Sequence, residues 1–362
     1  MPRTRGKLCR LGRLGAVLAA SAGLFASQAA PALATPEPPE REISGTAAPS
    51  PARTPLKDLT DNHVGSAVNA SALANEADYR SVLTSEFNSV TAENAMKWSV
   101  VEPNRGQYDW SGADSVVNYA QRNGHSVRGH TLLWHKQRPG WLDNLSASEL
   151  RSAVKDHITT VVNRYEGEIR AWDVVNEVFD SDGTRRDSIF QRKLGDGWIA
   201  DAFRWAHQAD PSAELYINDY NTGWVNDKSN AIHDLVSSLR QRGVPIHGVG
   251  FQTHLSIDYS FPGGFQSNLQ RFADLGVDVA ITEADVRMTL PATDSELTTQ
   301  ADYYERIWNA CEAVSRCVEF TTWGYTDRHS WVPNTFDGQG AACLFDDSLN
   351  PKPAYNRINP SI

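Results

Sequence analysis

The sequence predicts a single (β/α)8 TIM barrel, an α/β fold in which eight parallel strands alternate with helices. Short β-rich apolar runs alternate with longer stretches of helical period along most of the chain, and this alternation is typical of βα units built around a parallel sheet. The length of 362 residues suits one such barrel with extensions, since barrels of this kind often use about 250 residues or more. A doubly wound open sheet is the alternative.

Eight apolar runs are the expected strands: residues 63–68, 89–92, 127–133, 169–175, 214–217, 248–253, 277–282 and 318–322. Seven stretches of helical period lie between them: residues 72–87, 112–123, 146–165, 197–209, 227–242, 265–275 and 294–313. Ser146 and Glu149 form a capping-box pattern at one helix start. Gly124, Gly243 and Gly276 each follow a helical stretch, where a left-handed C-terminal position favours glycine.

The first residues of the chain do not belong to this core. Five basic residues up to Arg13 precede an apolar run over residues 14–25, and Ala32-Leu33-Ala34 supplies a small-x-small cleavage site. This order indicates a signal peptide over residues 1–34, with a short membrane anchor as the alternative. Residues 35–55 are rich in Pro, Ala, Ser and Thr, which favours a flexible leader. We therefore expect a secreted, extracellular protein with one (β/α)8 domain over residues 56–362.

The charge of the chain restricts its partners. The formal net charge is -10, and removing residues 1–34, with five basic and no acidic groups, gives -10 - 5 = -15. So acidic a surface disfavours nucleic acid and anionic membranes as partners. A neutral substrate is the better expectation.

Four cysteines are present. Cys9 leaves with the signal peptide, and Cys311 and Cys317 lie close together at the end of a helical stretch. In an exported protein this spacing predicts a local disulfide, which pins a turn more than it stabilises the fold. Cys343 is left over as either a buried or an exposed thiol.

Polar and aromatic residues follow several of the expected strands, at the edge where active sites of barrels lie. Two apolar strands end in acids, Glu177 and Glu283. Burying one carboxylate is costly unless partners satisfy it, so one such residue alone fits a structural role equally well. Two of them, at the fourth and seventh strands and among histidines and tryptophans, favour catalysis. Glycosidic bond cleavage requires one protonated and one ionised carboxyl group across a sugar-sized cleft.

Six sequence blocks carry a resemblance to a known family: ENAMKW (93–98), HTLLWHKQ (130–137), WDVVNE (172–177), GFQTH (250–254), ITEAD (281–285) and TWGYTDRHSW (322–331). Together they resemble glycoside hydrolase family 10, the barrel xylanases, over about residues 56–358. Each block alone is moderately specific, and six in the right order are strong.

The resemblance implies roles for individual residues. Glu177 matches the acid/base and Glu283 the nucleophile, while His254 matches the histidine that keeps the nucleophile ionised. Asn176 matches the asparagine that holds the sugar 2-hydroxyl, a contact that strengthens in the transition state. The remaining matches line the sugar-binding subsites on the non-reducing side or form the aromatic lid over them: Glu93, Asn94, Lys97, His130, Trp134, Gln252, Trp323 and Trp331.

Structural alternatives exist for some of these residues. Trp134 and Trp323 also suit core filling, and Lys97 also suits a solvated surface. His130 and His135 suit a metal pair, but their spacing on a strand places them on opposite faces, so no metal is expected.

The leading hypothesis is therefore a retaining endo-1,4-β-xylanase that acts as a monomer on xylan and xylo-oligosaccharides without a cofactor. A β-1,4-glucanase on the same scaffold is the second hypothesis, and it depends on whether Trp331 crowds the C6 carbon of glucose. A non-catalytic sugar-binding protein is the third, and such a protein would be expected to lack one of the two glutamates.

Overall fold

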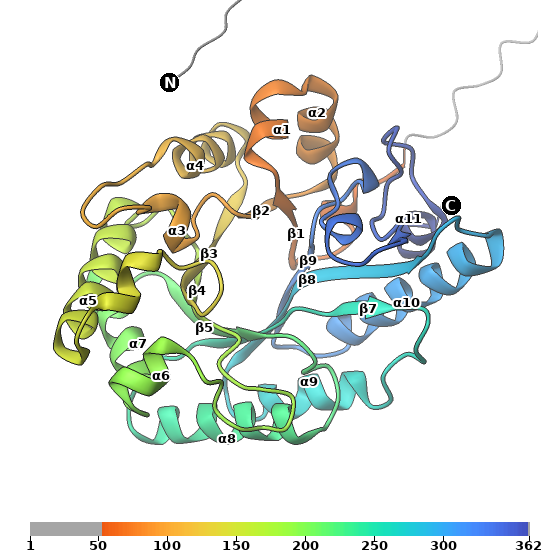
Figure 1. Cartoon of the computed structure of the whole chain (residues 1–362). Helices are drawn as coiled ribbons and strands as arrows, with labels where there is room; N and C mark the ends of the chain where they lie inside the picture. Colours follow the sequence, from red (N-terminus) through yellow and green to blue (C-terminus); the bar gives the residue numbers. More distant parts are fainter. Residues whose placement is uncertain (1–52, 361–362) are drawn as a thin grey trace, which may run out of the picture. The chain divides into compact units, whose positions relative to one another are not determined.

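The computed structural model describes residues 53–360 and confirms the (β/α)8 barrel (Figure 1). The predicted signal peptide and most of the predicted leader lie outside these residues. The barrel strands are β1 (His63–Val68), β2 (Ser89–Ala92), β3 (Ser126–Trp134), β4 (Ala171–Asn176), β5 (Glu214–Asp219), β6 (Gly248–Phe251), β8 (Asp278–Thr289) and β9 (Cys317–Thr322). Neighbouring strands pair in parallel, and β9 pairs with both β1 and β8. The sheet is thus closed, which excludes the open-sheet alternative.

Helices surround the ring of strands (Figure 1). They are α1 (Ala70–Asn75), α2 (Ala77–Glu86), α3 (Trp98–Val101), α4 (Ser111–Asn123), α5 (Ala147–Arg164), α6 (Ile189–Leu194), α7 (Trp198–Ala209), α8 (Asp227–Gln241), α9 (Phe265–Ala273), α10 (Asp294–Glu312) and α11 (Pro353–Ile358). Short 3-10 turns are η1 (Leu56–Asp58), η2 (Gly140–Asn144), η3 (Asp327–His329) and η4 (Val332–Asn334).

Several predicted helix ends are confirmed. Ser146 and Glu149 form the expected capping box at the start of α5, which satisfies backbone N–H groups that have no partner inside the helix. Gly124, Gly243 and Gly276 have φ angles of 69°, 63° and 76°, a left-handed conformation that glycine adopts without a Cβ clash.

The prediction of one helix over residues 72–87 is wrong. The Asn69 side chain caps a helix that begins earlier, at Ala70, and Glu76 then takes an extended conformation with φ -111° and ψ 113°. The Glu76 carboxylate pairs with Arg328 and His329, each at 3.0 Å, in the turn that follows β9. These long-range contacts accompany a break that a local helical pattern does not reveal.

Charged residues fill part of the barrel interior. Arg128 on β3 is fully buried and pairs with Asp173 on β4 at 2.8 Å and with Glu319 on β9 at 2.7 Å. Arg170 also pairs with Glu319. A buried charge is tolerated when it is paired and hydrogen-bonded in this way.

The seventh barrel strand is longer than predicted. The sequence predicts a strand over residues 277–282, whereas β8 continues to Thr289 beyond the barrel rim. Two short strands cover the extension: β7 (His254–Ser256) pairs with it in parallel and β10 (Gln339–Gly340) in antiparallel orientation. Residues 252–253, predicted as strand, separate β6 from β7. The extension of β8 (residues 283–289), β7 and β10 together form a ledge beside the barrel mouth, which the sequence does not predict.

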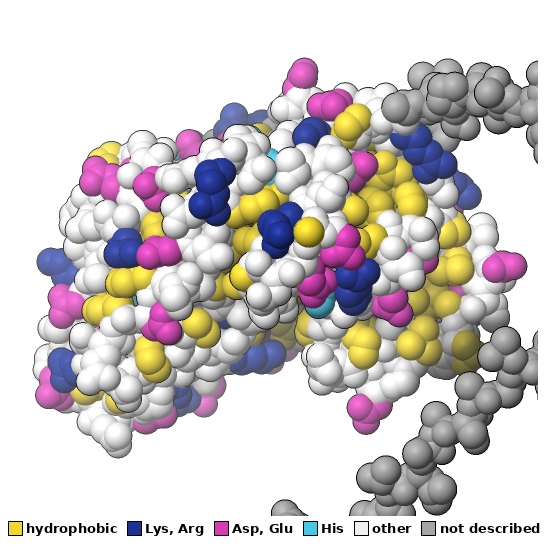
Figure 2. All heavy atoms as spheres, turned by 90° about the horizontal axis from the view of Figure 1, so that it is seen from above, with side chains coloured by type: hydrophobic (Ala, Val, Ile, Leu, Met, Phe, Trp, Pro, Cys, Tyr) yellow, Lys and Arg dark blue, Asp and Glu magenta, His cyan; other side chains and the backbone are white. Residues whose placement is uncertain are grey.

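The cysteine prediction is confirmed, since Cys311 at the end of α10 is disulfide-bonded to Cys317 at the start of β9. Cys343 is a buried thiol whose pKa is raised by burial, which decides between the two alternatives. Among residues 53–360, no helix combines the length and apolar character needed to cross a membrane. Lys and Arg side chains are interspersed with Asp and Glu on the face shown in Figure 2.

Candidate active site

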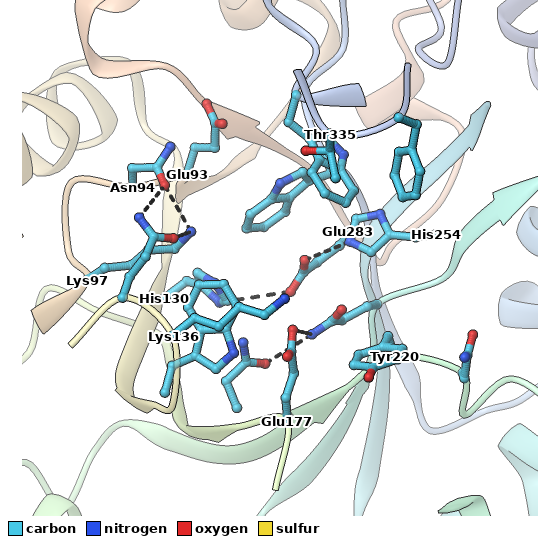
Figure 3. A pocket seen from close by; sticks show the side chains of 18 of the residues that line it. Glu93, Asn94, Lys97, His130, Lys136, Glu177, Tyr220, His254, Glu283 and Thr335 are labelled. Atoms are coloured by element: carbon cyan, nitrogen blue, oxygen red, sulfur yellow. Dashed lines mark hydrogen bonds and ion pairs between the residues drawn. The ribbon is translucent and has the colours of Figure 1, made fainter. Parts of the chain in front are cut away.

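One cleft of about 500 Å³ at the carboxyl ends of the strands collects all the predicted catalytic and substrate-binding residues (Figure 3). Its lining includes the twelve residues Glu93, Asn94, Lys97, His130, Trp134, Asn176, Glu177, Gln252, His254, Glu283, Trp323 and Trp331. They come from six barrel strands or from the segments that follow them, and His254 lies on β7, which follows β6. The closed barrel therefore brings together residues that are up to 238 positions apart (331 - 93).

Glu283 lies on β8, is only 4% exposed and is held by two donors. Asn218 Nδ2 donates to Oε1 at 2.6 Å, and His254 Nε2 lies 3.0 Å from Oε2. The other ring nitrogen of His254, Nδ1, lies 2.8 Å from Asp285 Oδ2. The imidazole is thus placed between two carboxylates.

The contacts of His254 with the two carboxylates determine the charges of His254 and Glu283. Burial acts to lower the pKa of His254, but Asp285 and Glu283 outweigh it and raise the pKa to about 10. Burial likewise acts to raise the pKa of Glu283, but the hydrogen bond and charge of His254, the charge of His130 and the hydrogen bond from Asn218 together lower it. Glu283 is therefore an ionised carboxylate beside a protonated imidazole at neutral pH, the state that a nucleophile needs.

Glu177 follows β4 and has a different environment. Its backbone adopts a left-handed φ of 57°, and its N–H donates to the carbonyl oxygen of Asn218 at 3.0 Å. The Oε1 atom accepts a long 3.5 Å hydrogen bond from Gln252, while Oε2 lies 3.9 Å from His135 Nδ1 and has no hydrogen-bond partner among the described residues. Figure 3 shows the carboxyl groups of Glu177 and Glu283 pointing toward one another.

Amide side chains connect the two glutamates. Asn176 Oδ1 accepts hydrogen bonds from Asn218 and Gln252, each at 3.1 Å, which leaves the Asn176 NH2 group available to a ligand. Asn218 Oδ1 accepts from Thr282 at 2.7 Å. A Cβ atom on Gly250 would lie only 2.3 Å from Asn218 Oδ1, so the absence of a side chain at residue 250 keeps room for this network.

One wall of the cleft is built around Lys97, beside the two glutamates and their amide partners. Its Nζ donates to Asn94 Oδ1 at 2.9 Å and Gln137 Oε1 at 2.7 Å, and it lies 4.9 Å from the centroid of the Trp134 ring. Burial lowers its pKa to about 8, against the opposing charges of Glu283, Glu93 and Glu177. Lys97 is only 5% exposed, so the solvated-surface alternative is wrong. Trp134 is partly exposed and lines the cleft, which distinguishes it from a core residue.

His130 and His135 approach different glutamates. His130 Nδ1 lies 2.9 Å from Asp173 Oδ2 and 4.0 Å from Glu283 Oε1, whereas His135 Nδ1 lies 3.9 Å from Glu177 Oε2. Through Asp173, His130 joins Glu283 to the buried charges of the barrel interior.

Asp285 and Asp219 have distinct partners. Asp285 Oδ2 accepts a hydrogen bond from Trp331 Nε1 at 2.7 Å in addition to its contact with His254. Trp331 is thereby fixed with its ring centroid 4.9 Å from that of His254. Asp219 pairs with buried Lys228 at 2.6 Å.

Sequence reasoning missed several residues at the site. The sequence predicts no role for Asn218, because its contact with Glu283 depends on the strand register that sets it opposite Asn176. His135 was considered only as a metal ligand. Further lining residues come from loops and from the ledge: Lys136, Gln137, Tyr220, Asn221, Arg287, Thr335 and Phe336.

Comparisons with known proteins point to one family. Residues 55–360 match the family described as glycosyl hydrolase family 10. The chain is 48% identical over 302 residues to an endo-1,4-β-xylanase of Agaricus bisporus, covering 83% of this chain and 88% of that protein. It is 41% identical over 317 residues to endo-1,4-β-xylanase B of Thermotoga neapolitana, covering 84% and 90%.

Solved structures show the same relationship. The crystal structure of xylanase 10B from Thermotoga petrophila in complex with xylobiose superimposes with a TM-score of 0.81 at 39% identity, covering 84% of this chain and 95% of that one. A glycosylated family 10 endo-β-1,4-xylanase from Gloeophyllum trabeum gives a TM-score of 0.82 at 37% identity, covering 85% and 98%.

Proposed function

The chain belongs to glycosyl hydrolase family 10, and from this membership we propose that it is an endo-1,4-β-xylanase that cleaves xylan with net retention of anomeric configuration. One observation carries the mechanism: two buried glutamates from β4 and β8 face one cleft with unlike partners. Glu283 is bound by a protonated histidine and an amide, whereas Glu177 has one weak donor.

The unlike partners assign the roles. Glu283 attacks the anomeric carbon while Glu177 donates a proton to the departing glycosidic oxygen, which gives a covalent glycosyl-enzyme. Glu177, now ionised, removes a proton from water, and that water displaces Glu283 to restore both carboxyl groups. Every proton and nucleophile in this cycle comes from the chain, the sugar or water, so the reaction needs no cofactor.

The two walls suit a chain of neutral sugars. On the proposed non-reducing side, Glu93, Asn94 and Lys97 present donors and acceptors to hydroxyl groups, and the Asn176 NH2 group is available to the 2-hydroxyl at the cleavage point. Trp134, Trp323 and Trp331 offer apolar ring faces or edges to sugar C–H groups.

The stereochemistry of the first product tests the mechanism. We expect NMR of a xylohexaose digest to show β-anomeric product first, followed by slow mutarotation. Initial release of the α-anomer would require the inverting geometry, in which the carboxyl groups lie about 6.5–9.5 Å apart to admit water.

Comparing substrates distinguishes the two enzymatic hypotheses. We expect faster cleavage of xylan than of carboxymethyl-cellulose, because Trp331 is fixed by Asp285 and packs against His254 close to the nucleophile, where a C6 hydroxymethyl group needs room. Faster cellulose cleavage would favour the glucanase. Release of reducing sugar from xylan excludes the non-catalytic sugar-binding protein.

The proposal extends to export and assembly. Residues 1–34 act as a signal peptide, residues 35–55 as a leader and residues 56–362 as a monomeric catalytic domain. N-terminal sequencing of protein from the culture medium should begin at Thr35, and light scattering should give the mass of one chain. Retention in the cell or a dimeric mass would contradict the respective statement.

A further inference from the structure

Arg287 is the single arginine among the described residues that line the cleft. Its one link to an acid is indirect, through Gln339, whose Oε1 accepts from Arg287 Nε at 2.8 Å and whose Nε2 donates to Asp258 Oδ2 at 3.1 Å. Arg287 is half-buried, yet its guanidinium lies within 4.0 Å of no carboxylate or other acidic partner in residues 53–360. Most buried or half-buried charges elsewhere in the barrel, such as Arg128 and Lys228, have an acidic partner. A cation left without a partner inside a binding cleft is available to a ligand.

The guanidinium is nevertheless held in place by neutral groups. Arg287 Nε donates to Gln339 Oε1 at 2.8 Å, and Nη1 donates to the carbonyl oxygen of Leu255 at 3.3 Å. Its Cζ atom lies 4.0 Å from the ring centroid of Phe336. The Nη2 atom has no acceptor among the described residues. The group is therefore ordered before binding, and part of its planar fork remains free for a carboxylate, the anion that this geometry fits.

Strand geometry places Arg287 away from the bond that is cleaved. Glu283, Asp285 and Arg287 alternate along β8 and so share one face. At about 3.3 Å per residue, Arg287 lies on the order of 13 Å along the strand from Glu283. In register, β7 sets Ser256 opposite Arg287 and His254 opposite Asp285.

This position belongs to the half of the cleft opposite the Lys97 wall. Figure 3 shows Glu93, Asn94 and Lys97 on one side of the two glutamates, and His254 and Tyr220 on the other. Because Arg287 extends the strand beyond His254's partner Asp285, it lies on the His254 side. In the proposed function, that side receives the sugars of the leaving group.

We propose that Arg287 binds the carboxylate of a uronic-acid side group carried by the substrate chain in the leaving-group half of the cleft. The inference rests on the proposed xylanase function, in which the backbone sugars are neutral and only acidic side groups bear charge. The chain as a whole has a net charge of -10 and repels polyanions. A preorganised cation in the cleft offsets this repulsion at one point and selects acid-substituted segments.

The experiment compares three substrates: linear xylohexaose, a xylo-oligosaccharide of the same backbone length with one uronic-acid side group, and the same acidic oligosaccharide after its carboxyl group is reduced to a hydroxymethyl. The variant is Arg287→Met. The matched control is Arg306→Met, since Arg306 also lies 4.0 Å from a phenylalanine ring, that of Phe261, but does not line the cleft.

We expect Arg287→Met to lower the ratio of kcat/KM for the acidic to the carboxyl-reduced substrate about tenfold, the loss typical of a hydrogen bond to a charged group. The effect should appear mainly in KM and shrink in wild-type protein as NaCl is raised. Arg287→Lys should keep part of the preference, because it retains charge without the fork. Arg306→Met should leave the ratio as in wild type.

An unchanged ratio in Arg287→Met, or equal loss on acidic and reduced substrates, overturns the inference. If Arg287→Met does not fold, the wild-type protein decides. A ratio of kcat/KM for the acidic to the carboxyl-reduced substrate that is near one and independent of salt also overturns the inference. Failure of the wild-type protein to cleave any of the three substrates, including xylohexaose, would instead contradict the proposed function, so the two failures are distinguishable.

Discussion

His254 Nε2 lies 3.0 Å from Glu283 Oε2 and forms the main charged contact of the proposed nucleophile. The same ring contacts Asp285, so its positive charge is stabilised from both sides. The ionisation of Glu283 thus depends on a residue from another strand, and the following predictions begin with this dependence.

Replacing His254 with Asn should move the acidic limb of activity to higher pH. In the wild type, Glu283 has a lowered pKa and loses its charge only as the pH falls below the ordinary carboxyl range. Without the imidazolium, burial acts against a weaker opposing effect, so the pKa of Glu283 rises. The pH profile of kcat/KM on xylohexaose measures this shift. A loss of activity that is equal at every pH would indicate a structural role only.

Replacing Glu177 with Ala should separate substrates by their leaving groups. Xylan needs a proton on the departing oxygen, so its turnover should fall by about 10²–10⁴-fold. An aryl xylobioside with a very good leaving group needs little proton donation for the first step and should form the glycosyl-enzyme at a rate near that of wild type. Pre-steady-state release of the phenol is the measurement. Equal loss on both substrates would contradict the acid role.

Replacing Glu283 with Ala should abolish hydrolysis without loss of folding. The variant lacks the attacking carboxylate but keeps the walls of the cleft, so calorimetry should still detect binding of xylohexaose. Turnover close to that of wild type would exclude Glu283 as the nucleophile.

Replacing Glu319 with Gln should destabilise the barrel at neutral pH by about 3–5 kcal/mol, because Arg128 loses its bidentate partner inside the barrel. Burial acts to raise the pKa of Glu319, but Arg128 and Arg170 lower it well below 4.5. Its contribution to stability is therefore full above about pH 4.5 and is lost as the pH falls through the lowered pKa.

Urea unfolding of the Glu319→Gln variant and the wild type at several pH values tests this prediction. The difference in free energy of unfolding should be largest near neutral pH and should decrease on strong acidification. Asp187→Asn provides the control, because its pair with Arg192 is mostly exposed and should contribute less than about 1 kcal/mol. Equal effects of the two substitutions would contradict the prediction.

Removing the disulfide should have a modest effect. Cys311 and Cys317 are separated by six positions, and so short a loop removes limited entropy from the unfolded chain, so the double Ala variant should lose about 2 kcal/mol. Thermal unfolding with and without reductant measures this. Activity on xylan should persist, since the disulfide lies outside the residues that line the cleft.

Much of the barrel is readable from the sequence because its strands are buried on both faces and appear as short apolar runs. β1 and β2 have the predicted bounds. Predictions fail where distant contacts override local pattern, as at Glu76, whose partners lie more than 250 positions away. The extension of β8 also escaped prediction, because its partners β7 and β10 are too short to give a signal of their own.

The active site likewise has features that the sequence predicts and features that depend on tertiary contacts. The strand-end position of Glu177 and Glu283 follows from the chain order, and the family resemblance supplies the expectation for His254. The contact of Asn218 with Glu283 depends on the register between β4 and β5 and on the curvature of the closed sheet. The Nη2 atom of Arg287 has no acceptor among the described residues because of how its tertiary neighbours are placed, which the sequence does not reveal.

Because the backbone at Glu177 is left-handed, the residue that the proposed reaction needs is not the residue that would make the fold most stable. A side chain with a Cβ at this φ is strained, by on the order of 1–3 kcal/mol. Selection of random variants for heat resistance alone should therefore recover Gly or Asn at this position, because both tolerate the conformation and neither buries a carboxyl group. Variants selected in this way would be more stable but would lack the proton donor for glycosidic cleavage. Directed evolution of this enzyme must therefore screen for turnover in every round.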